Sequence, residues 1–363
     1  MNKSIFIAGG GTGGHLFPAL SIGNELIKNN INIYYIGSKY GIEKDFFDKN
    51  KLNYYLLNIR GIQRNFSLKS IINNIMFPIY FIQSYSKSIK LIRRHKPIAI
   101  IGTGGYCSGV PLIAGIRLKI PTFIQDQNSI PGLITKILQK RVNKIFLGYN
   151  IKEKFKINNS IYTGNPIRKE LLKKDKLESK KILGFDKNKK LIFILGGSQG
   201  SSPINKHILK NIDFYNNEGY EILWQSGKND FELLKSKISH SSVMIKQFIN
   251  DMSLAYSAAD IIISRAGALA ISEMSYMGKA MILIPFPQAA ENHQHLNAKI
   301  IADNNACILI EQKQLQTHIL EESIKMILNS EKKIKKLEHN SKMIAIPNTS
   351  KKIVTEIIKS IEC

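Results

Sequence analysis

At 363 residues the chain is long enough for two domains of ordinary size, and its hydrophobic content of 44% excludes disorder throughout. Lysine and arginine number 52 against 27 aspartates and glutamates, and this net charge of +25 favours an anionic partner such as nucleic acid, acidic lipid or a phosphorylated substrate. The chain is also rich in Ile, Asn and Lys, so we attribute part of the charge to compositional bias.

The first half alternates predicted strands with turns and helices, the order typical of a parallel sheet wrapped on both faces. The predicted strands are 4–8, 32–36, 54–59, 98–101, 121–125, 144–147 and 161–162. The first strand runs into Gly9-Gly-Gly-Thr12-Gly13-Gly14-His15, and a helix is predicted from Leu16 to about Asn29. Gly9, Gly11 and Gly14 fit G-x-G-x-x-G in the strand–helix setting that binds phosphates or dinucleotides.

A nicotinamide cofactor is disfavoured by the end of the second predicted strand. A dinucleotide enzyme places Asp or Glu there to hold the ribose, and this chain has Gly37-Ser38-Lys39 instead. Ser38 and Lys39 leave NADP open as a cofactor.

A further glycine turn is predicted from Gly102 to Gly109, and a polar loop from Asp126 to Gly132.

Residues 71–96 combine large apolar side chains with a basic end. The stretch from Ile71 to Ile82 is apolar, and Lys87, Lys90, Arg93, Arg94 and Lys96 follow it. A core helix with a solvated basic end is the ordinary explanation. We favour a helix lying on an anionic membrane surface, because apolar residues beside cations suit such a contact and the nearby glycine turn suits a lipid-linked ligand.

Gly164-Asn165-Pro166 predicts a hinge over 163–168, because this sequence continues neither helix nor strand. Beyond it the pattern restarts, with predicted strands at 191–195, 221–225, 242–245, 260–264, 281–284 and 306–310. A second glycine turn, 196–201, follows the first of these strands. We therefore predict two similar α/β domains, both Rossmann-like, facing each other across a cleft.

The stretch from Ala259 to Ala298 carries the densest functional signal. The helix predicted to open at Ala268 presents backbone N–H groups and its positive dipole end to a phosphate. Glu273, further along this helix, can accept two ribose hydroxyl hydrogens, and Gln294 offers donor and acceptor atoms to a sugar. An ordinary strand–turn–helix unit with a solvated Glu273 explains these residues about as well.

The tail from Gln312 to Cys363 is predicted to be helical and lysine-rich, with a break at Pro347. We expect Ile353 to Ile361 to pack back on the first domain, because leaving this apolar face in water would lose the free energy gained by burying it.

The three cysteines, Cys107, Cys307 and Cys363, form no C-x-x-C pair, which argues against disulfides and zinc. The absence of a long apolar run and of a signal-peptide core predicts a soluble, cytoplasmic protein.

The chemistry that these residues permit is transfer from a nucleotide sugar or hydride transfer from a dinucleotide. The sequence has no Asp-x-Asp pair, so we expect no metal at the diphosphate. Helix N-termini, Ser198 and Arg168 would instead meet the charge of the leaving group. His15 follows the first glycines directly, where a neutral imidazole can act as general base; a histidine that merely packs the turn is the alternative.

Six motifs in order resemble the MurG family of bacterial glycosyltransferases. They are Gly9-Gly-Gly-Thr-Gly-Gly-His15-Leu-Phe-Pro18, Gln127-Asn128-Ser-Ile-Pro-Gly132, Thr163-Gly-Asn-Pro-Ile-Arg168, Gly196-Gly-Ser-Gln-Gly200, Ser264-Arg-Ala-Gly-Ala-Leu-Ala-Ile-Ser-Glu273 and Asn292-His-Gln294-x-x-Asn297-Ala298. The resemblance implies a GT-B fold and inverting transfer of GlcNAc from UDP-GlcNAc to the C4 hydroxyl of MurNAc in lipid I. It implies peripheral attachment to the cytoplasmic face of the membrane, no cofactor, no resident metal and no nucleic-acid partner, and it leaves room for other cell-wall synthesis proteins as partners.

The resemblance also implies domains and site residues. Residues 1–163 would form the acceptor and membrane-side domain, 164–346 the UDP-GlcNAc-binding domain, and 347–363 a helix returning to the first domain. His15 would be the catalytic base. The donor contacts would be Thr12, Gly13, Gly14, Asn128, Arg168, Ser198, Ile249 (through its backbone, to the uracil), Ala268, Leu269, Ala270, Ile271, Ser272, Glu273 and Gln294. Gly104, Gly105 and Tyr106 would meet the acceptor diphosphate.

One residue departs from the family pattern. Asp126 stands where the family often has Glu, and its shorter side chain argues against direct catalysis by this carboxylate.

Three other functions stay open. The first is a UDP-GlcNAc 2-epimerase, which needs no lipid acceptor. The others are a dinucleotide oxidoreductase and a basic membrane- or nucleic-acid-binding protein with a degenerate glycine fold. Two well-formed glycine turns together with Glu273 and Gln294 argue against the last of these.

Overall fold

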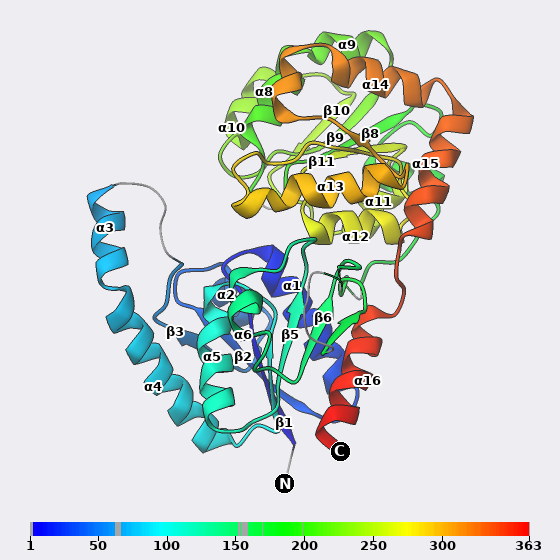
Figure 1. The fold of residues 1–363 in the computed structure, drawn as a ribbon. Helices are drawn as coiled ribbons and strands as arrows, with labels where there is room; N and C mark the ends of the chain where they lie inside the picture. The colour runs from blue at the N-terminus through cyan, green and yellow to red at the C-terminus, as the bar shows by residue number, and fades with distance from the viewer. Residues whose placement is uncertain are drawn as a thin grey trace. The chain divides into compact units, whose positions relative to one another are not determined.

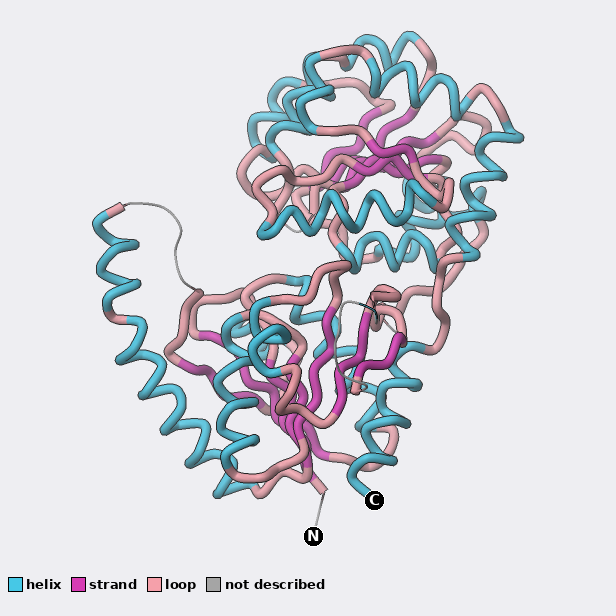
Figure 2. Tube along the Cα trace, in the orientation of Figure 1, coloured by secondary structure: helices cyan, strands magenta, loops and turns pink. Residues whose placement is uncertain are grey.

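The computed structural model describes residues 3–61, 67–151, 153, 159–168, 170–197 and 199–362. Its internal contacts divide the chain into two compact units, Met1–Arg168 with Asn348–Cys363, and Lys169–Pro347. Gly164 to Arg168 therefore belong with the first unit, whereas the sequence placed the boundary before Gly164. In each unit the strands form a central sheet enclosed by helices (Figure 1, Figure 2).

The first unit contains a parallel sheet of seven strands in the order β3-β2-β1-β4-β5-β6-β7. The strands are β1 Ser4–Ala8, β2 Asn32–Ser38, β3 Tyr54–Leu57, β4 Ala99–Gly102, β5 Thr122–Asp126, β6 Lys144–Leu147 and β7 Ser160–Tyr162. Most of their residues are buried, as expected for strands with helices on both faces. The strand order reverses between β1 and β4, and this switch point is where open α/β sheets bind ligands.

The helices of the first unit are α1 Gly13–Ile27, α2 Glu43–Lys49, α3 Leu68–Ile75, α4 Phe77–His95, α5 Tyr106–Arg117, α6 Leu133–Leu138 and α16 Thr349–Glu362. The C-terminal helix α16 packs beside α1 and buries Ile353, Val354 and Ile357 in the core of this unit. Each buried aliphatic side chain contributes roughly 1.5–3 kcal/mol. Burial of this face accounts for the return of the C-terminal segment to the first unit.

Two predicted boundaries in this unit were wrong. The glycine turn expected to reach Gly109 ends sooner, because Tyr106 already begins α5. The stretch from Ile71 onward is two helices, α3 and α4, with Met76 between them. Figure 1 shows α3 leading into α4 along one side of the unit.

The second unit contains a parallel sheet of six strands in the order β10-β9-β8-β11-β12-β13. The strands are β8 Leu191–Leu195, β9 Glu221–Gln225, β10 Val243–Lys246, β11 Ile261–Ser264, β12 Met281–Leu283 and β13 Ile308–Leu309. Its helices are α7 Lys176–Leu183, α8 Ser202–Lys210, α9 Ile212–Asn217, α10 Phe231–Lys237, α11 Met252–Ala258, α12 Ala268–Tyr276, α13 His293–Asp303, α14 Ile319–Leu328 and α15 Glu331–Met343, with 3-10 turns η2 Ala290–Asn292 and η3 Gln312–Gln316. The order again reverses in the middle, between β8 and β11.

A buried ion cluster fastens α7 to this second sheet. Asp260, which precedes β11, accepts hydrogen bonds from Lys180 Nζ and the Leu191 N–H, both at 2.8 Å, and also pairs with Lys176. Lys180 is only 2% exposed.

Among the residues that the structure describes, no helix is both long and apolar enough to cross a membrane.

Candidate active site

Two glycine loops meet at the switch point of the first sheet. One follows β1, from Gly9 to Thr12, and the other follows β4, from Thr103 to Gly105. Gly105 has φ +75°, and a Cβ there would lie 2.6 Å from the carbonyl oxygen of Gly10, so only glycine permits this approach. The contact joins the two loops around the start of α1.

His15, in the first turn of α1, is held by groups from the loops that follow β4 and β5. Its Nδ1 lies 3.1 Å from the carbonyl oxygen of Thr103 and 3.1 Å from Oε1 of Gln127. The Thr103 hydroxyl also donates to the His15 carbonyl oxygen at 2.8 Å. The predicted base therefore occupies a defined position at the junction of the two glycine loops.

A pocket of about 620 Å³ opens beside His15 in the first unit. Its described lining residues are Gly10, Gly11, Thr12, His15, Ser38, Tyr40, Gly41, Ile59, Arg60, Gly61, Gly105, Tyr106 and Cys107, none of which is acidic. The guanidinium carbon of Arg60 lies 3.5 Å from the centre of the Tyr40 ring, and Arg60 Nε is buried without a hydrogen-bond partner among the described residues. Arg60 was not predicted as a site residue, because no motif surrounds it.

Asp126 shapes the loop that carries Asn128. The carboxylate accepts the Gly132 N–H at 2.8 Å and the Asn128 N–H at 3.3 Å. Burial raises the pKa of Asp126, although hydrogen bonds from Thr135 and these backbone groups lower it in part. The Asp126 carboxylate is thus engaged by the backbone of its own loop.

In the second unit the loops at the switch point are tied together by Gln225, at the end of β9. Its Nε2 donates to the Gly197 carbonyl oxygen and its Oε1 accepts the Ile249 N–H, both at 2.9 Å. The N–H of Ile249, a predicted donor contact, is thus hydrogen-bonded within the second unit. Ser198, predicted to meet the diphosphate, lies outside the described residues.

The segment from Ala268 to Glu273 forms the first part of α12, as predicted. Glu273 is buried, with 4% of its surface exposed, and its Oε2 accepts a hydrogen bond from the hydroxyl of Tyr256 at 3.0 Å. Tyr256 lies on α11 and is fully buried. The sequence alone does not distinguish Tyr256, the hydrogen-bond partner of Glu273, from an ordinary core aromatic residue.

Arg265 positions the loop that follows β12. Its Nη1 donates to the carbonyl oxygens of Ile284 and Pro285 at 3.1 and 3.0 Å, and its Nη2 donates to Gln312 at 2.6 Å. Burial lowers the pKa of Arg265 to about 10. Gln294, on α13, closes the same loop, because its Oε1 accepts the Phe286 N–H at 3.0 Å.

The remaining predicted donor contacts lie in the first unit. Thr12 and Gly14 are exposed and Gly13 is buried at the start of α1, while Asn128 is half-buried. The guanidinium carbon of Arg168 lies 4.1 Å from the centre of the Phe17 ring on α1. This ring contact joins Arg168 to α1 of the first unit.

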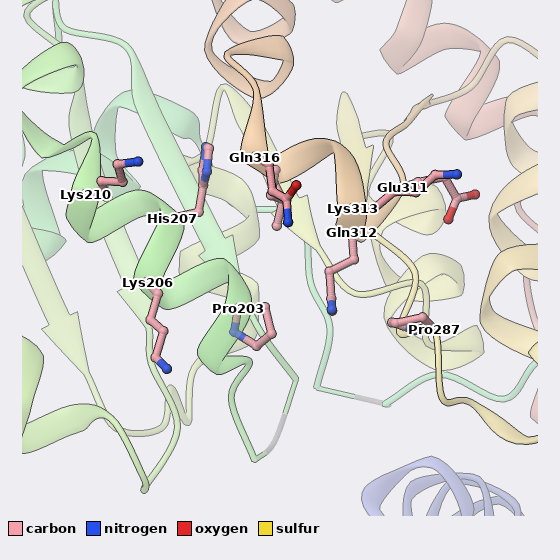
Figure 3. Close-up of a pocket in the computed structure, with 10 residues that line it drawn as sticks. Pro203, Lys206, His207, Lys210, Pro287, Glu311, Gln312, Lys313 and Gln316 are labelled. Carbon is pink, nitrogen blue, oxygen red and sulfur yellow. The ribbon is translucent and has the colours of Figure 1, made fainter.

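A second pocket, of about 900 Å³, lies in the second unit between α8 and η3. Figure 3 shows Lys206 and Lys210 along α8, with Lys313 and Gln312 on the other side. Among the described residues, none of the predicted donor contacts lines this pocket.

Within the described ranges, no group of three or more His, Cys, Asp and Glu side chains is placed to hold a metal ion.

Family models define the class of protein. The model of the glycosyltransferase family 28 N-terminal domain matches residues 5–147, and that of the family 28 C-terminal domain matches residues 191–359. Structural likeness agrees: Acinetobacter baumannii MurG aligns with a TM-score of 0.76 at 24% identity, covering 98% of this chain and 99% of that one. The calicheamicin glycosyltransferase CalG4 aligns with a TM-score of 0.70 at 11% identity, covering 99% and 98%. The two parallel α/β sheets thus form a GT-B glycosyltransferase fold, which confirms the predicted fold class.

Sequence relatives narrow the class to one family. A protein of Flavobacterium psychrophilum named UDP-N-acetylglucosamine--N-acetylmuramyl-(pentapeptide) pyrophosphoryl-undecaprenol N-acetylglucosamine transferase is 41% identical over 361 residues, covering 98% of this chain and 97% of that protein. A Bacillus subtilis protein of the same name is 32% identical, covering 96% and 97%. The chain belongs to this transferase family, and the predicted family is confirmed.

Proposed function

We propose that the protein transfers GlcNAc from UDP-GlcNAc to the C4 hydroxyl of MurNAc in undecaprenyl-pyrophosphoryl-MurNAc-pentapeptide, lipid I, and so forms lipid II for peptidoglycan synthesis. The observation that carries this proposal is the match, over nearly the whole chain, to transferases whose name states this donor and this acceptor. The site geometry supports the chemistry: a positioned histidine in the first unit and, in the second, a buried acid in the middle of α12.

In the proposed reaction the acceptor oxygen attacks C1 of GlcNAc from the face opposite the diphosphate, and the bond between C1 and the diphosphate oxygen breaks. The acceptor proton passes to His15, and UDP leaves with the electron pair of the broken bond. One displacement inverts the anomeric centre and gives a β-1,4 linkage. General-base catalysis of this kind contributes about 10²–10⁴-fold to the rate.

We assign most of the donor binding to the second unit. Glu273 would accept the ribose hydroxyls, Ile249 would bind the uracil edge, and Gln294 the sugar. The free N-terminal N–H groups of α12, those of Ala268, Leu269 and Ala270, would face the diphosphate with the positive end of the helix dipole. Ile271 and Ser272, further along the same helix, would add donor contacts. Thr12, Gly13, Gly14, Asn128, Arg168 and Ser198 complete the proposed donor contacts, and the proposal includes no cofactor and no resident metal.

The pocket beside His15 suits the acceptor. Its lining residues include Gly10, Gly11 and Thr12 of the first glycine loop, Gly105 of the second, and Arg60. We propose that Gly104, Gly105 and Tyr106 bind the acceptor diphosphate, and that Arg60 adds a permanent positive charge to this pocket. An arginine stacked on an aromatic ring, as Arg60 is on Tyr40, is well suited to bind an oxyanion.

Incubation with labelled UDP-GlcNAc, with and without a lipid I analogue, tests the proposal. We expect UDP and a β-1,4-linked disaccharide lipid only when the acceptor is present. Conversion of UDP-GlcNAc to its 2-epimer without acceptor would instead identify an epimerase. The variant His15→Ala should lower kcat by about 10²–10⁴-fold with little change in the KM for UDP-GlcNAc. The exposed His240→Ala serves as its control, and equal turnover of the two variants would remove His15 from the base role.

We further propose that α3 and α4 attach the protein peripherally to the cytoplasmic face of the membrane. Ile71, Ile75, Ile79 and Ile82 recur at spacings of three and four residues, which is typical of one helix face, and Ile75 is 70% and Ile82 65% exposed. The same spacing continues through Ser86 to the exposed Lys90 and Arg93. An apolar stripe that runs into cations matches the apolar and anionic layers of a lipid surface.

Flotation with lipid vesicles tests this attachment. The wild-type protein should float with vesicles that contain anionic phosphatidylglycerol, and less with pure phosphatidylcholine. The double variant Ile75→Asn/Ile82→Asn should lose most of the flotation. Ile182→Asn, which alters an isoleucine of similar exposure (62%) on α7, is the matched control. Equal flotation of both variants would contradict a role for α3 and α4.

A further inference from the structure

We propose that three buried side-chain amides, those of Asn165, Gln125 and Gln127, hold the proton of the neutral His15 ring on Nδ1 and so leave Nε2 as its basic atom. The inference rests on the proposed function only for the catalytic consequence, since the position of the proton is a property of the protein alone. All three amides are buried, Gln125 completely. They come from β5, from the loop after it, and from the segment after β7.

The three amides form a chain of hydrogen bonds with one direction. Asn165 Nδ2 donates to the Gln127 backbone carbonyl at 3.0 Å, which turns Asn165 Oδ1 toward Gln125. Gln125 Nε2 donates to that oxygen at 3.1 Å. Gln127 Nε2 in turn donates to Gln125 Oε1 at 2.5 Å. Each amide thus presents its oxygen to the NH₂ group of the next.

Backbone carbonyls fix the orientation of the last amide. Gln127 Nε2 lies 2.7 Å from the Thr103 carbonyl oxygen and 3.2 Å from the Gln125 carbonyl oxygen, and both of these atoms can only accept. A flipped Gln127 would set its oxygen against three acceptor oxygens. Gln127 therefore keeps Oε1 toward His15.

His15 Nδ1 consequently faces two acceptors, Gln127 Oε1 and the Thr103 carbonyl oxygen, each at 3.1 Å. A nitrogen between two acceptors must carry the proton, because an unprotonated nitrogen would repel both oxygens. In the neutral imidazole the lone pair then lies on Nε2. Gln127 acts through His15 and is a positioning residue.

Gly148 packs against this chain of three amides, which we call the amide relay. A Cβ on Gly148 would lie 2.2 Å from Asn165 Oδ1 and 2.6 Å from the Gln127 carbonyl oxygen, so a side chain at 148 would displace the first link. Glycine at 148 thus leaves the space that Asn165 fills. This role for Asn165 is separate from the hinge that its motif predicted.

Nitrogen NMR of protein labelled with ¹⁵N-histidine tests the proposal at a pH at which the ring is neutral. The chain has 8 histidines, and the pair of signals missing from His15→Gln identifies residue 15. We expect Nδ1 in the range of protonated ring nitrogens and Nε2 in the range of unprotonated ones. A proton on Nε2 in the wild-type protein would overturn the proposal, whatever the variants do.

Substitution at 127 tests the relay itself. Gln127→Met keeps the length and removes the amide, so we expect a mixture of ring tautomers and a kcat about tenfold lower or more, with the KM for UDP-GlcNAc nearly unchanged. Gln139→Met, the same change just after α6 and outside the relay, should alter neither quantity. An unchanged tautomer and kcat in Gln127→Met would show that the relay is not needed.

The two proposals fail in different ways. If His15 carries its proton on Nδ1 but the wild-type protein forms no disaccharide from lipid I, the proposed transferase function fails and the relay stands. If the protein transfers GlcNAc while the proton lies on Nε2, the relay alone is wrong.

Discussion

Gly104 lies directly against the ring of His15. A Cβ on Gly104 would be 2.4 Å from His15 Nδ1 and 2.7 Å from Cε1, and Gly104 has φ +101°. A side chain at position 104 would therefore overlap the imidazole, and the absence of one leaves the space that the ring occupies. The position of the proposed base depends on a glycine 89 residues further along the chain (104 − 15).

Gly104→Ala should displace His15. A shift of the proposed base by about 1 Å lowers kcat on the order of 10²-fold, and the positive φ costs about 1–2 kcal/mol of folding free energy in addition. Steady-state kinetics and urea denaturation measure the two effects. Gly184→Ala is the matched control, because Gly184 has φ +81° and a Cβ added there would meet nothing within 4 Å. The control should lose stability but keep its kcat; a comparable loss of kcat in the control would contradict the steric explanation.

Glu273→Gln should weaken UDP binding about ten- to hundredfold, because hydrogen bonds to a charged acceptor are worth roughly 1.5–3 kcal/mol. Calorimetric titration with UDP measures this loss. Tyr256→Phe removes only the hydroxyl that orients Glu273 and should cause a smaller loss in the same direction. With a 2′,3′-dideoxy analogue of UDP the penalty of Glu273→Gln should vanish. A penalty that persists with the analogue would place Glu273 away from the ribose.

Arg60→Gln should raise the KM for the lipid I analogue about tenfold and leave the KM for UDP-GlcNAc unchanged, because the substitution removes the positive charge of the acceptor pocket. Arg60→Lys keeps the charge without the planar fork and should recover part of the loss. Kinetics with acceptor analogues that carry or lack the pentapeptide separate a diphosphate contact from a peptide carboxylate contact. Arg141→Gln, at an exposed arginine of the same unit, is the control. An effect confined to the KM for UDP-GlcNAc would exclude Arg60 from the acceptor pocket.

The sheets could be predicted because strands buried on both faces appear as short apolar runs that end at glycine or polar residues. The strands 4–8, 144–147, 191–195 and 221–225 agree residue for residue with the structure. Other ends moved by one or two residues, and only Ile308 and Leu309 of the predicted strand 306–310 pair in the sheet. Tyr106 was assigned to a turn for two reasons. The glycines before it are typical of a loop, and Pro111 is unusual inside a helix, yet both belong to the start and the interior of α5.

The candidate site was predictable only where its residues lie in motifs. His15, Glu273 and the glycine loops are visible in the sequence because a turn or a helix start fixes their local geometry. The partners that orient them are not visible, because Gln127 reaches His15 across 112 positions and Tyr256 reaches Glu273 from a neighbouring helix. Polar residues inside an apolar strand, such as Gln125 in β5, are the one sequence signal that could have pointed to the amide relay.

Asp260→Asn should destabilise the second unit by about 3–5 kcal/mol, because it leaves the buried Lys180 ammonium without its counter-charge. Urea denaturation followed by the fluorescence of Trp224 measures this loss, since the chain's single tryptophan is buried in the second sheet. Asp251→Asn is the matched control: it breaks an exposed pair with Lys174, which is worth about 0–1 kcal/mol, and Asn keeps the helix cap. Similar losses in the two variants would contradict a special role for the buried pair.

The same carboxylate predicts a pH dependence of unfolding. Burial by itself raises the pKa of Asp260, but Lys176, the Leu191 N–H and Lys180 outweigh it and lower the pKa below its usual value of 3.8. The unfolded chain then binds its proton at a higher pH than the folded protein does. Asp260 contributes its full stabilisation above the unfolded pKa and loses it as the pH falls from there through the lower folded pKa. The wild-type free energy of unfolding should therefore fall more steeply below about pH 4 than that of Asp260→Asn, and parallel curves would show that another carboxylate dominates acid unfolding.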